Sequence, residues 1–188
     1  MRAAEEAPDS AREIWTVGHS NHTLAAFQEI LAVNRVEQVL DVRRFPVSRR
    51  LPHFNAESLS KSLVSVGIRY AGFPELGGRR TARPASPHVS WRVQAFRGYA
   101  DFMDTQEFQE GLGRLMAHAR QKRSALMCAE ALPWRCHRSL IADALLARGW
   151  TVCEILSKKE TRPRVLPVFA RLEGTRVVYD GPQQTLPL

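Results

Sequence analysis

The chain contains 188 residues, 44% of them hydrophobic and 24% charged, which is the composition of an ordinary globular protein and not of a disordered one. Lysine and arginine total 27 against 19 aspartate and glutamate residues, and the resulting net charge of +8 favours an anionic partner such as phosphate, a nucleotide or nucleic acid. Only four of the basic residues are lysine, and an arginine bias of this kind also follows from a GC-rich genome.

The termini and the cysteines give no sign of export. Residues 1–12 are polar and charged, so we expect a disordered leader and no secretory signal. Three cysteines cannot all pair, and no apolar run approaches the roughly 20 residues of a membrane span. We expect a cytoplasmic protein with reduced thiols, no membrane association and a single domain over residues 13–188; no oligomeric state follows from the sequence.

Apolar strands alternate with amphipathic helices in the first half of the chain. Residues 14–17 and 36–42 have the pattern of buried strands, and another strand is expected to begin at 68–70. The helical spacing of apolar residues predicts one helix from about Thr23. A second helix is expected after Asn55, which is a plausible N-cap.

A long loop interrupts this alternation at residues 74–90, which are rich in glycine, proline and arginine. A loop of this length inside a compact domain is usually functional or disordered. A short helix is expected to close at 99–103. Asp104 and Glu107 resemble a capping box, which predicts the start of a further amphipathic helix there.

The remaining elements restore the alternation. We predict a strand at 124–128, a helix at 136–148, a strand at 151–156, and a hairpin formed by 165–172 and 175–179. Strands that alternate with helices imply parallel pairing. The expected fold is therefore α/β, with an open, mostly parallel sheet flanked by helices and a small C-terminal hairpin.

Polar residues follow three of the predicted strands, and ligands of open α/β sheets bind beyond the carboxyl ends of the strands. The three polar exits are Gly18-His19-Ser20, Asp41 with Arg43, and Cys128-Ala129-Glu130. These exits are expected to converge on one pocket.

The stretch from Glu130 to Arg138 carries the strongest chemical signal. A helix N-terminus attracts anions and lowers the pKa of a cysteine, so Cys136 is a candidate nucleophile. His137 is a candidate proton carrier, and Arg138 could hold a phosphate or carboxylate with two hydrogen bonds. Glu130 could act as a base or pair with an arginine.

Ordinary structural roles explain several of these residues as well. Cys128 lies in an apolar strand, where packing is the commoner role, and Cys136 fits packing and reactivity equally. Asp41 could simply pair with a buried Arg43, and Cys153 is expected to be structural. The spacing Cys-x7-Cys-His matches no standard zinc template, so we expect no metal and no cofactor.

A second group of basic residues could form a rim around the site. Its members are Arg43, Arg44, Arg49, Arg50 and His53, together with Arg79, Arg80 and Arg83. The stretch 91–99 then interleaves aromatic residues with arginines, a pattern that holds single-stranded nucleic acid. A solvated surface explains the same residues equally well. The sequence has no Walker loop, Rossmann fingerprint, GxSxG elbow or zinc-finger spacing.

Six ordered landmarks between about residues 14 and 156 resemble the bacterial family catalogued as domain of unknown function 488. They are Thr16-Val17-Gly18-His19-Ser20, Asp41-Val42-Arg43 with Pro46 and Ser48-Arg49, Phe54-Asn55, Gly67-Ile68-Arg69-Tyr70, Glu75-Leu76-Gly77-Gly78-Arg79, and Cys128-Ala129-Glu130 with Cys136-His137-Arg138. Residues 131–135 depart from the resemblance because they are less charged than those of relatives. The resemblance implies an α/β fold, and some members of the family are labelled as DNA-repair proteins.

Together these signals favour an enzyme, a hydrolase or transferase that acts on a phosphorylated or nucleotide-like anion. The candidates for catalysis are Cys136, His137, Glu130, His19 and Asp41. The candidates for binding the anion are Arg43, Arg49, Arg138 and Ser20. One alternative is a non-catalytic nucleic-acid-binding protein, associated with DNA repair. Another is a thiol or metal sensor built on Cys128, Cys136 and His137.

Overall fold

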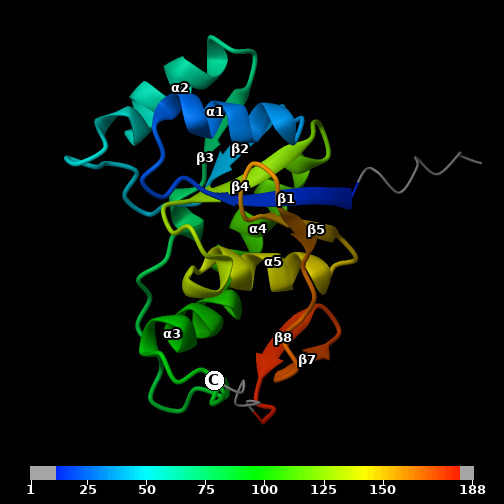
Figure 1. Ribbon diagram of the computed structural model, residues 1–188. Helices are drawn as coiled ribbons and strands as arrows, with labels where there is room; N and C mark the ends of the chain where they lie inside the picture. Colours follow the sequence, from blue (N-terminus) through cyan, green and yellow to red (C-terminus); the bar gives the residue numbers. More distant parts are fainter. Residues whose placement is uncertain (1–11, 183–188) are drawn as a thin grey trace, which may run out of the picture.

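A computed structural model describes residues 12–182 and places them around a six-stranded sheet (Figure 1). The strand order is β3-β2-β4-β1-β5-β6, and every neighbouring pair is parallel except β5 and β6. The strands are β1 (Glu13–Gly18), β2 (Gln38–Asp41), β3 (Arg69–Gly72), β4 (Ser124–Cys128), β5 (Thr151–Ile155) and β6 (Thr161–Pro163). The predicted open, mostly parallel sheet is confirmed.

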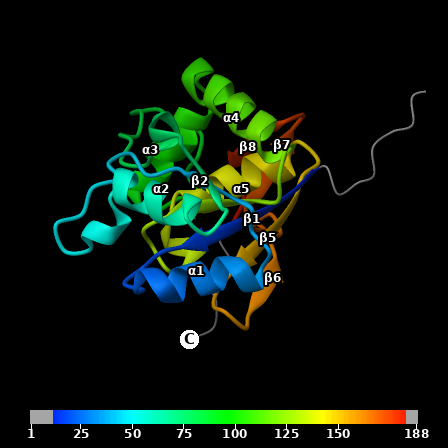
Figure 2. The same ribbon diagram turned by 90° about the horizontal axis from the view of Figure 1, so that it is seen from above.

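Helices cover both faces of this sheet (Figure 1, Figure 2). One face carries α1 (Leu24–Val33) and α2 (Ala56–Val64), and the other carries α3 (Gln94–Met103), α4 (Gln106–Ala119) and α5 (Arg138–Leu146). Short 3-10 helices precede α2, follow β3 and precede α5: η2 (Pro52–Phe54), η3 (Pro74–Leu76) and η4 (Pro133–Arg135).

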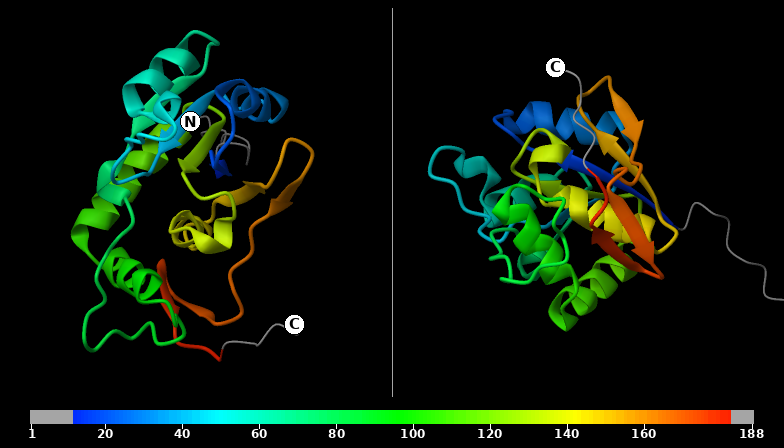
Figure 3. Two further views of the ribbon diagram at one scale, coloured as in Figure 1. Left: turned by 60° about the vertical axis from the view of Figure 1, so that its left-hand side comes forward. Right: turned by 90° about the horizontal axis from the view of Figure 1, so that it is seen from below.

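The predicted C-terminal hairpin is present as β7 (Ala170–Glu173) and β8 (Arg176–Tyr179). Figure 3 shows it beside α5, away from α1 and α2. The Tyr179 hydroxyl donates to the Asp143 carboxylate of α5 at 2.9 Å. The hairpin therefore extends the core under α5 and adds no strand to the main sheet.

The central strands are buried on both faces, which is why they are apolar throughout and do not alternate. All five residues of β4 and all four of β2 are buried. One hydrophobic cluster fills the space under α1 and α2, and a larger one fills the space under α3, α4, α5 and the hairpin.

Three details differ from the sequence predictions. The N-cap of α4 is Thr105, whose hydroxyl accepts from the Phe108 amide, so the capping box predicted at Asp104 is wrong by one residue. Helix α5 begins at Arg138, and Cys136 precedes it. Strand β6 was not predicted, because three exposed residues give no apolar pattern.

The predicted leader, residues 1–12, lies outside the described residues except for Arg12. Among the helices between residues 12 and 182, none is both long enough and apolar enough to cross a membrane.

Candidate functional site

A pocket of about 380 Å³ lies at the carboxyl ends of β2 and β4. The adjacent strands β2 and β4 are followed by helices on opposite faces of the sheet, α2 and α5 respectively, so the chain leaves the two strand ends in opposite directions. In open α/β sheets such a divergence opens the crevice in which ligands bind. The volume is within the usual range for small-molecule pockets, about 300–1,000 Å³.

Four of the predicted site residues line this pocket: Arg43, Glu130, Cys136 and His137. Cys128, for which packing was considered the commoner role, lines it as well at the end of β4. The other lining residues come from the segments after β2, β3 and β4 and from the start of α3: Arg44, Phe45, Gly78, Arg79, Val93, Ala95, Phe96, Ala129 and Arg135. Three polar strand exits were predicted to converge, and those of β2 and β4 meet here.

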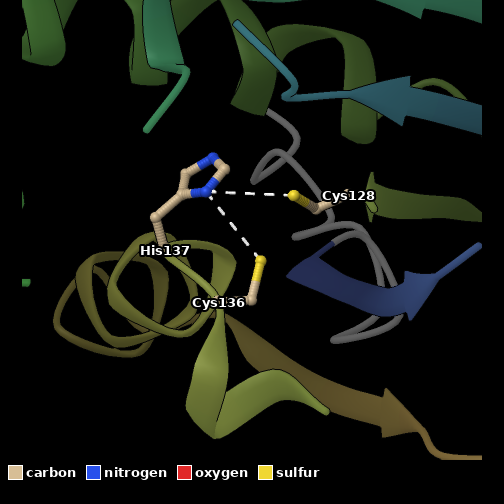
Figure 4. A group of neighbouring side chains, drawn as sticks. All are labelled: Cys128, Cys136 and His137. Atoms are coloured by element: carbon tan, nitrogen blue, oxygen red, sulfur yellow. Dashed lines mark hydrogen bonds between the residues drawn. The ribbon is translucent and has the colours of Figure 1, made fainter. Parts of the chain in front are cut away.

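Cys128, Cys136 and His137 form a compact cluster in the pocket wall (Figure 4). Both sulfur atoms point toward Nδ1 of His137, which lies 3.9 Å from Sγ of Cys128 and 3.8 Å from Sγ of Cys136. Nε2 of His137 lies 3.0 Å from the carbonyl oxygen of Val42. Because a carbonyl only accepts, Nε2 carries the ring proton and Nδ1 presents its lone pair to the sulfurs.

The two thiols respond in opposite directions to this environment. A hydrogen bond from Cys136 and the nearby His137 ring hold the pKa of Cys128 well below its usual value. Burial and the neighbouring Cys128 raise the pKa of Cys136 well above its usual value. The apo cluster therefore accommodates one negative charge more readily than two.

A buried network beside the cluster fixes Arg43. Its Nε donates to the Asp41 carboxylate at 2.8 Å, and its Nη1 lies 3.2 Å from Nε2 of His19. Nδ1 of His19 donates to the Ser20 carbonyl, so Nε2 is free to accept from Arg43. Burial and the Arg43 charge lower the pKa of His19 to about 4, which keeps its ring neutral.

Asp41 and His19, predicted as catalytic, thus position Arg43. Neither lines the pocket, and both are almost fully buried. The Asp41 carboxylate is already occupied by Arg43 and by the Tyr70 hydroxyl, which donates to it at 2.7 Å. The alternative role considered for Asp41, as ion-pair partner of a buried arginine, describes the observed contacts.

Tyr70→Phe is expected to lower the free energy of unfolding by about 1.5 kcal/mol, because it removes a hydrogen bond to a charged, buried acceptor. Urea denaturation monitored by circular dichroism measures this change. A loss below about 0.5 kcal/mol would show that Arg43 alone holds the Asp41 carboxylate.

Arg138, predicted to bind the anion, does not line the pocket. Its side chain is fully buried, and its two terminal nitrogens donate to the carbonyl oxygens of Glu130 and Ala131. These bonds tie the loop after β4 to the start of α5. Two further anion-binding candidates, Arg49 and Ser20, do not line the pocket, although Arg49 is exposed on the loop after β2.

Sequence reasoning missed two residues that shape the pocket. Arg135 lies in η4 and Phe45 follows β2, and both are exposed. Arg44 and Arg79, which were predicted as part of a basic rim, do line the pocket. The sequence did contain a signal for Phe45, because this residue directly follows two arginines at the end of a predicted strand.

Two aromatic residues of the stretch 91–99 are used for packing. Trp91 contacts the rings of Phe96 and Tyr179, with ring centroids 4.9 and 5.3 Å apart. Tyr99 is fully buried, and Arg97 donates to the Trp91 carbonyl. Tyr99 is therefore not available to stack on a base, whereas Phe96 lines the pocket, and nucleic-acid binding by this stretch stays a prediction.

A family model described as "Domain of unknown function DUF488" matches residues 23–145, well over half of the chain. The chain belongs to this family. The predicted resemblance is thereby confirmed, and the matched region of this DUF488 protein includes Asp41–Arg43 and the whole cysteine–histidine cluster. Comparisons with curated proteins and with solved structures found no match.

Proposed function

We propose that this DUF488 protein is an enzyme, a hydrolase or transferase that acts on a phosphorylated or nucleotide-like anion in the pocket beyond β2 and β4. One observation carries the proposal. The same pocket is lined by exposed arginines and by a cluster of two cysteines and a histidine. Residues that can bind an anion and residues that can carry out chemistry therefore line one pocket, whose volume suits a small ligand.

The arginines support an anionic substrate. Arg44, Arg79 and Arg135 are exposed, and none of them pairs with a carboxylate among residues 12–182. An arginine side chain presents a planar fork that matches the oxygens of a phosphate or carboxylate. Arg43 also lines the wall, but its charge is balanced by the Asp41 carboxylate, so the exposed arginines supply the net positive charge.

The apolar part of the lining supports a ligand with a ring. Phe45 is 63% exposed, although phenylalanine is among the residues most often buried. The guanidinium carbons of Arg44 and Arg79 lie 5.6 and 5.8 Å from the centre of its ring. Aromatic faces and arginines in this arrangement stack nucleobases, so a nucleotide-like substrate fits better than a simple phosphate.

The cluster and Glu130 supply groups for the chemical step. The exposed Glu130 lines the pocket, and its carboxylate can take or give a proton at a bound substrate. Cys128 and Cys136 supply sulfur atoms that can act on the substrate or hold a group that does.

Binding of a nucleotide tests the proposal. The double variant Arg79→Ala/Arg135→Ala is expected to bind AMP at least about 10-fold more weakly than wild type, because it loses two charge-assisted contacts. Isothermal titration calorimetry at fixed ionic strength measures the change. Arg69→Ala is the matched control and should bind like wild type, because Arg69 is exposed at the amino-terminal end of β3, whereas the pocket lies at the carboxyl ends of the strands.

Turnover is then measured with a panel of phosphomonoesters, phosphodiesters and nucleotides. Cys136→Ser and His137→Ala are expected to lose activity, whereas Arg69→Ala retains it. Equal binding by the double variant and wild type would contradict the proposed site. Binding of an oligonucleotide that only Arg92→Ala weakens would favour the non-catalytic nucleic-acid-binding alternative.

A further inference from the structure

We infer that Cys128, Cys136 and His137 bind a divalent metal ion of borderline softness, Zn²⁺ in the first place, with an open fourth position that faces the pocket. The three potential ligand atoms lie within 4.8 Å of one another, although nine residues separate Cys128 from His137. The fold brings them together, since β4 ends at the first cysteine and α5 begins just after the other two residues.

The spacing of the ligand atoms fits a tetrahedral ion. With Zn–S bonds of about 2.3 Å and a Zn–N bond of about 2.0 Å, a tetrahedral centre separates sulfur from nitrogen by about 3.5 Å. Nδ1 of His137 lies 3.8 and 3.9 Å from the two sulfur atoms. Movements of a few tenths of an ångström therefore bring the nitrogen to this spacing from each sulfur.

The orientation of His137 matches that of a metal-bound imidazole. Ligating histidines almost always donate their other ring N–H to a carbonyl or carboxylate, which fixes the tautomer. Here Nε2 donates to the Val42 carbonyl, and Nδ1 is turned toward both sulfurs (Figure 4). Because Nδ1 has one in-plane lone pair, two thiols compete for it, whereas a single ion between them satisfies all three ligands.

The surroundings leave a fourth coordination position open. Cys128, Cys136 and His137 all line the pocket, as does Gly78, which lies next to the His137 ring. A side chain at Gly78 would lie only 3.0 Å from Nδ1, so the glycine keeps this side of the ring clear. Three protein ligands with one vacant position are typical of catalytic zinc sites, in which the fourth ligand is water or substrate.

Sequence reasoning offered these three residues only as an alternative, a thiol or metal sensor, and expected no metal because the spacing Cys-x7-Cys-His departs from the usual zinc templates. The role of the ion in turnover rests on the proposed function, in which it would bind an oxygen atom of the anionic substrate or a water molecule. Binding of the ion itself does not depend on that function and is measured separately.

Cobalt spectroscopy on the full chain provides the test. One equivalent of Co²⁺ added to the reduced protein is expected to give a thiolate-to-metal charge-transfer band and the visible bands of a tetrahedral centre. Zn²⁺ should displace these bands. Cys128→Ser, Cys136→Ser and His137→Ala are each expected to weaken Zn²⁺ binding by about 100-fold or more, since even supporting residues outside the ligand set cost 10- to 100-fold.

Cys153→Ser is the matched control, because Cys153 lies on β5 outside the cluster. It should bind Co²⁺ and Zn²⁺ as wild type does. Far-ultraviolet circular dichroism verifies that each variant is folded. Alkylation of wild type, read by mass spectrometry, adds a measurement that needs no variant: Zn²⁺ should protect Cys128 and Cys136 and leave Cys153 unchanged.

Absence of the charge-transfer band in wild type, or its loss in Cys153→Ser, would overturn the inference. If wild type binds metal but Arg79→Ala/Arg135→Ala binds AMP as wild type does, the metal site stands and the proposed anion site is rejected. If the double variant loses AMP binding as expected but wild type binds no metal, the anion site stands and the metal site is rejected.

Discussion

Arg164→Met is expected to lower the free energy of unfolding by about 3 kcal/mol at pH 7. The Arg164 guanidinium lies between two carboxylates that are almost fully buried, 2.8 Å from Asp143 and 3.3 Å from Glu154. Removing one partner of a buried ion pair costs about 3–5 kcal/mol, because the remaining charge is left without compensation. We expect the lower end of this range, because each carboxylate keeps one donor in the variant. The Tyr179 hydroxyl still donates to Asp143, and Arg162 still donates to Glu154.

The loss should grow with pH. Burial raises the pKa of Asp143 to about 6, despite its contact with Arg164. A carboxyl group whose pKa is higher in the folded chain stabilises the fold below its unfolded pKa of about 4, and this contribution disappears as the pH rises through about 6. Without Arg164 the folded pKa rises further, so the destabilisation is expected to be larger at pH 8 than at pH 5.

Urea denaturation of wild type and variant at both pH values measures these effects. Arg171→Met is the matched control: Arg171 also lies between two carboxylates, those of Glu173 and Asp180, but all three side chains are exposed. Exposed ion pairs contribute about 0–1 kcal/mol. If both variants lose a similar free energy of unfolding, burial does not strengthen the contacts of Arg164, and the prediction is wrong.

The parts of the fold that were predicted are those in which local pattern and tertiary structure agree. Leu59 and Leu63 repeat at helical spacing and are fully buried in α2, and the apolar run of β4 is buried throughout. Val66, at the same helical spacing, lies beyond the end of α2 and is 51% exposed. Helical periodicity places a residue on a face only as far as the helix continues.

The candidate site was predicted in part, because the strand-end rule concerns backbone direction and not side-chain partners. It identified the exits of β2 and β4 correctly. It could not show that Arg138 turns inward to the carbonyls of Glu130 and Ala131, while Arg135 three residues earlier is exposed at the pocket. Whether an arginine binds a ligand or a loop depends on contacts between segments, which a single sequence does not contain.

The same limit explains Cys128. Its apolar strand predicted a packing role, and the side chain is indeed only 7% exposed. As the last residue of β4, however, it is also the one at which the strand reaches the pocket and contacts His137. Burial and chemical function are therefore compatible at a strand end.

Gly18→Ala is expected to lower the free energy of unfolding by about 3 kcal/mol. A Cβ atom on Gly18 would overlap the backbone carbonyl group of Glu130 and would touch the Cα of Ala131. Backbone atoms cannot rotate away as a side chain can, so the cost lies at the upper end of the 1–3 kcal/mol typical of overpacking.

The loop after β4 cannot move aside cheaply. The amides of His19 and Ser20 donate to the carbonyls of Cys128 and Ala129, both at 2.9 Å, and the buried Arg138 holds Glu130 from the other side. A shift of this loop would break these bonds and displace Cys128 from His137. Gly18→Ala is therefore expected to weaken Co²⁺ binding at the cluster as well as stability.

Gly113→Ala is the matched control, because Gly113 lies inside α4 and no atom is near the position of its missing Cβ. Alanine is favoured over glycine in a helix by roughly 0.5–1 kcal/mol, so this variant should be slightly more stable than wild type. Urea denaturation and Co²⁺ titration of both variants measure the contrast. A Gly18→Ala protein with wild-type stability and wild-type cobalt bands would show that the approach of β1 to the Glu130 loop does not constrain the site.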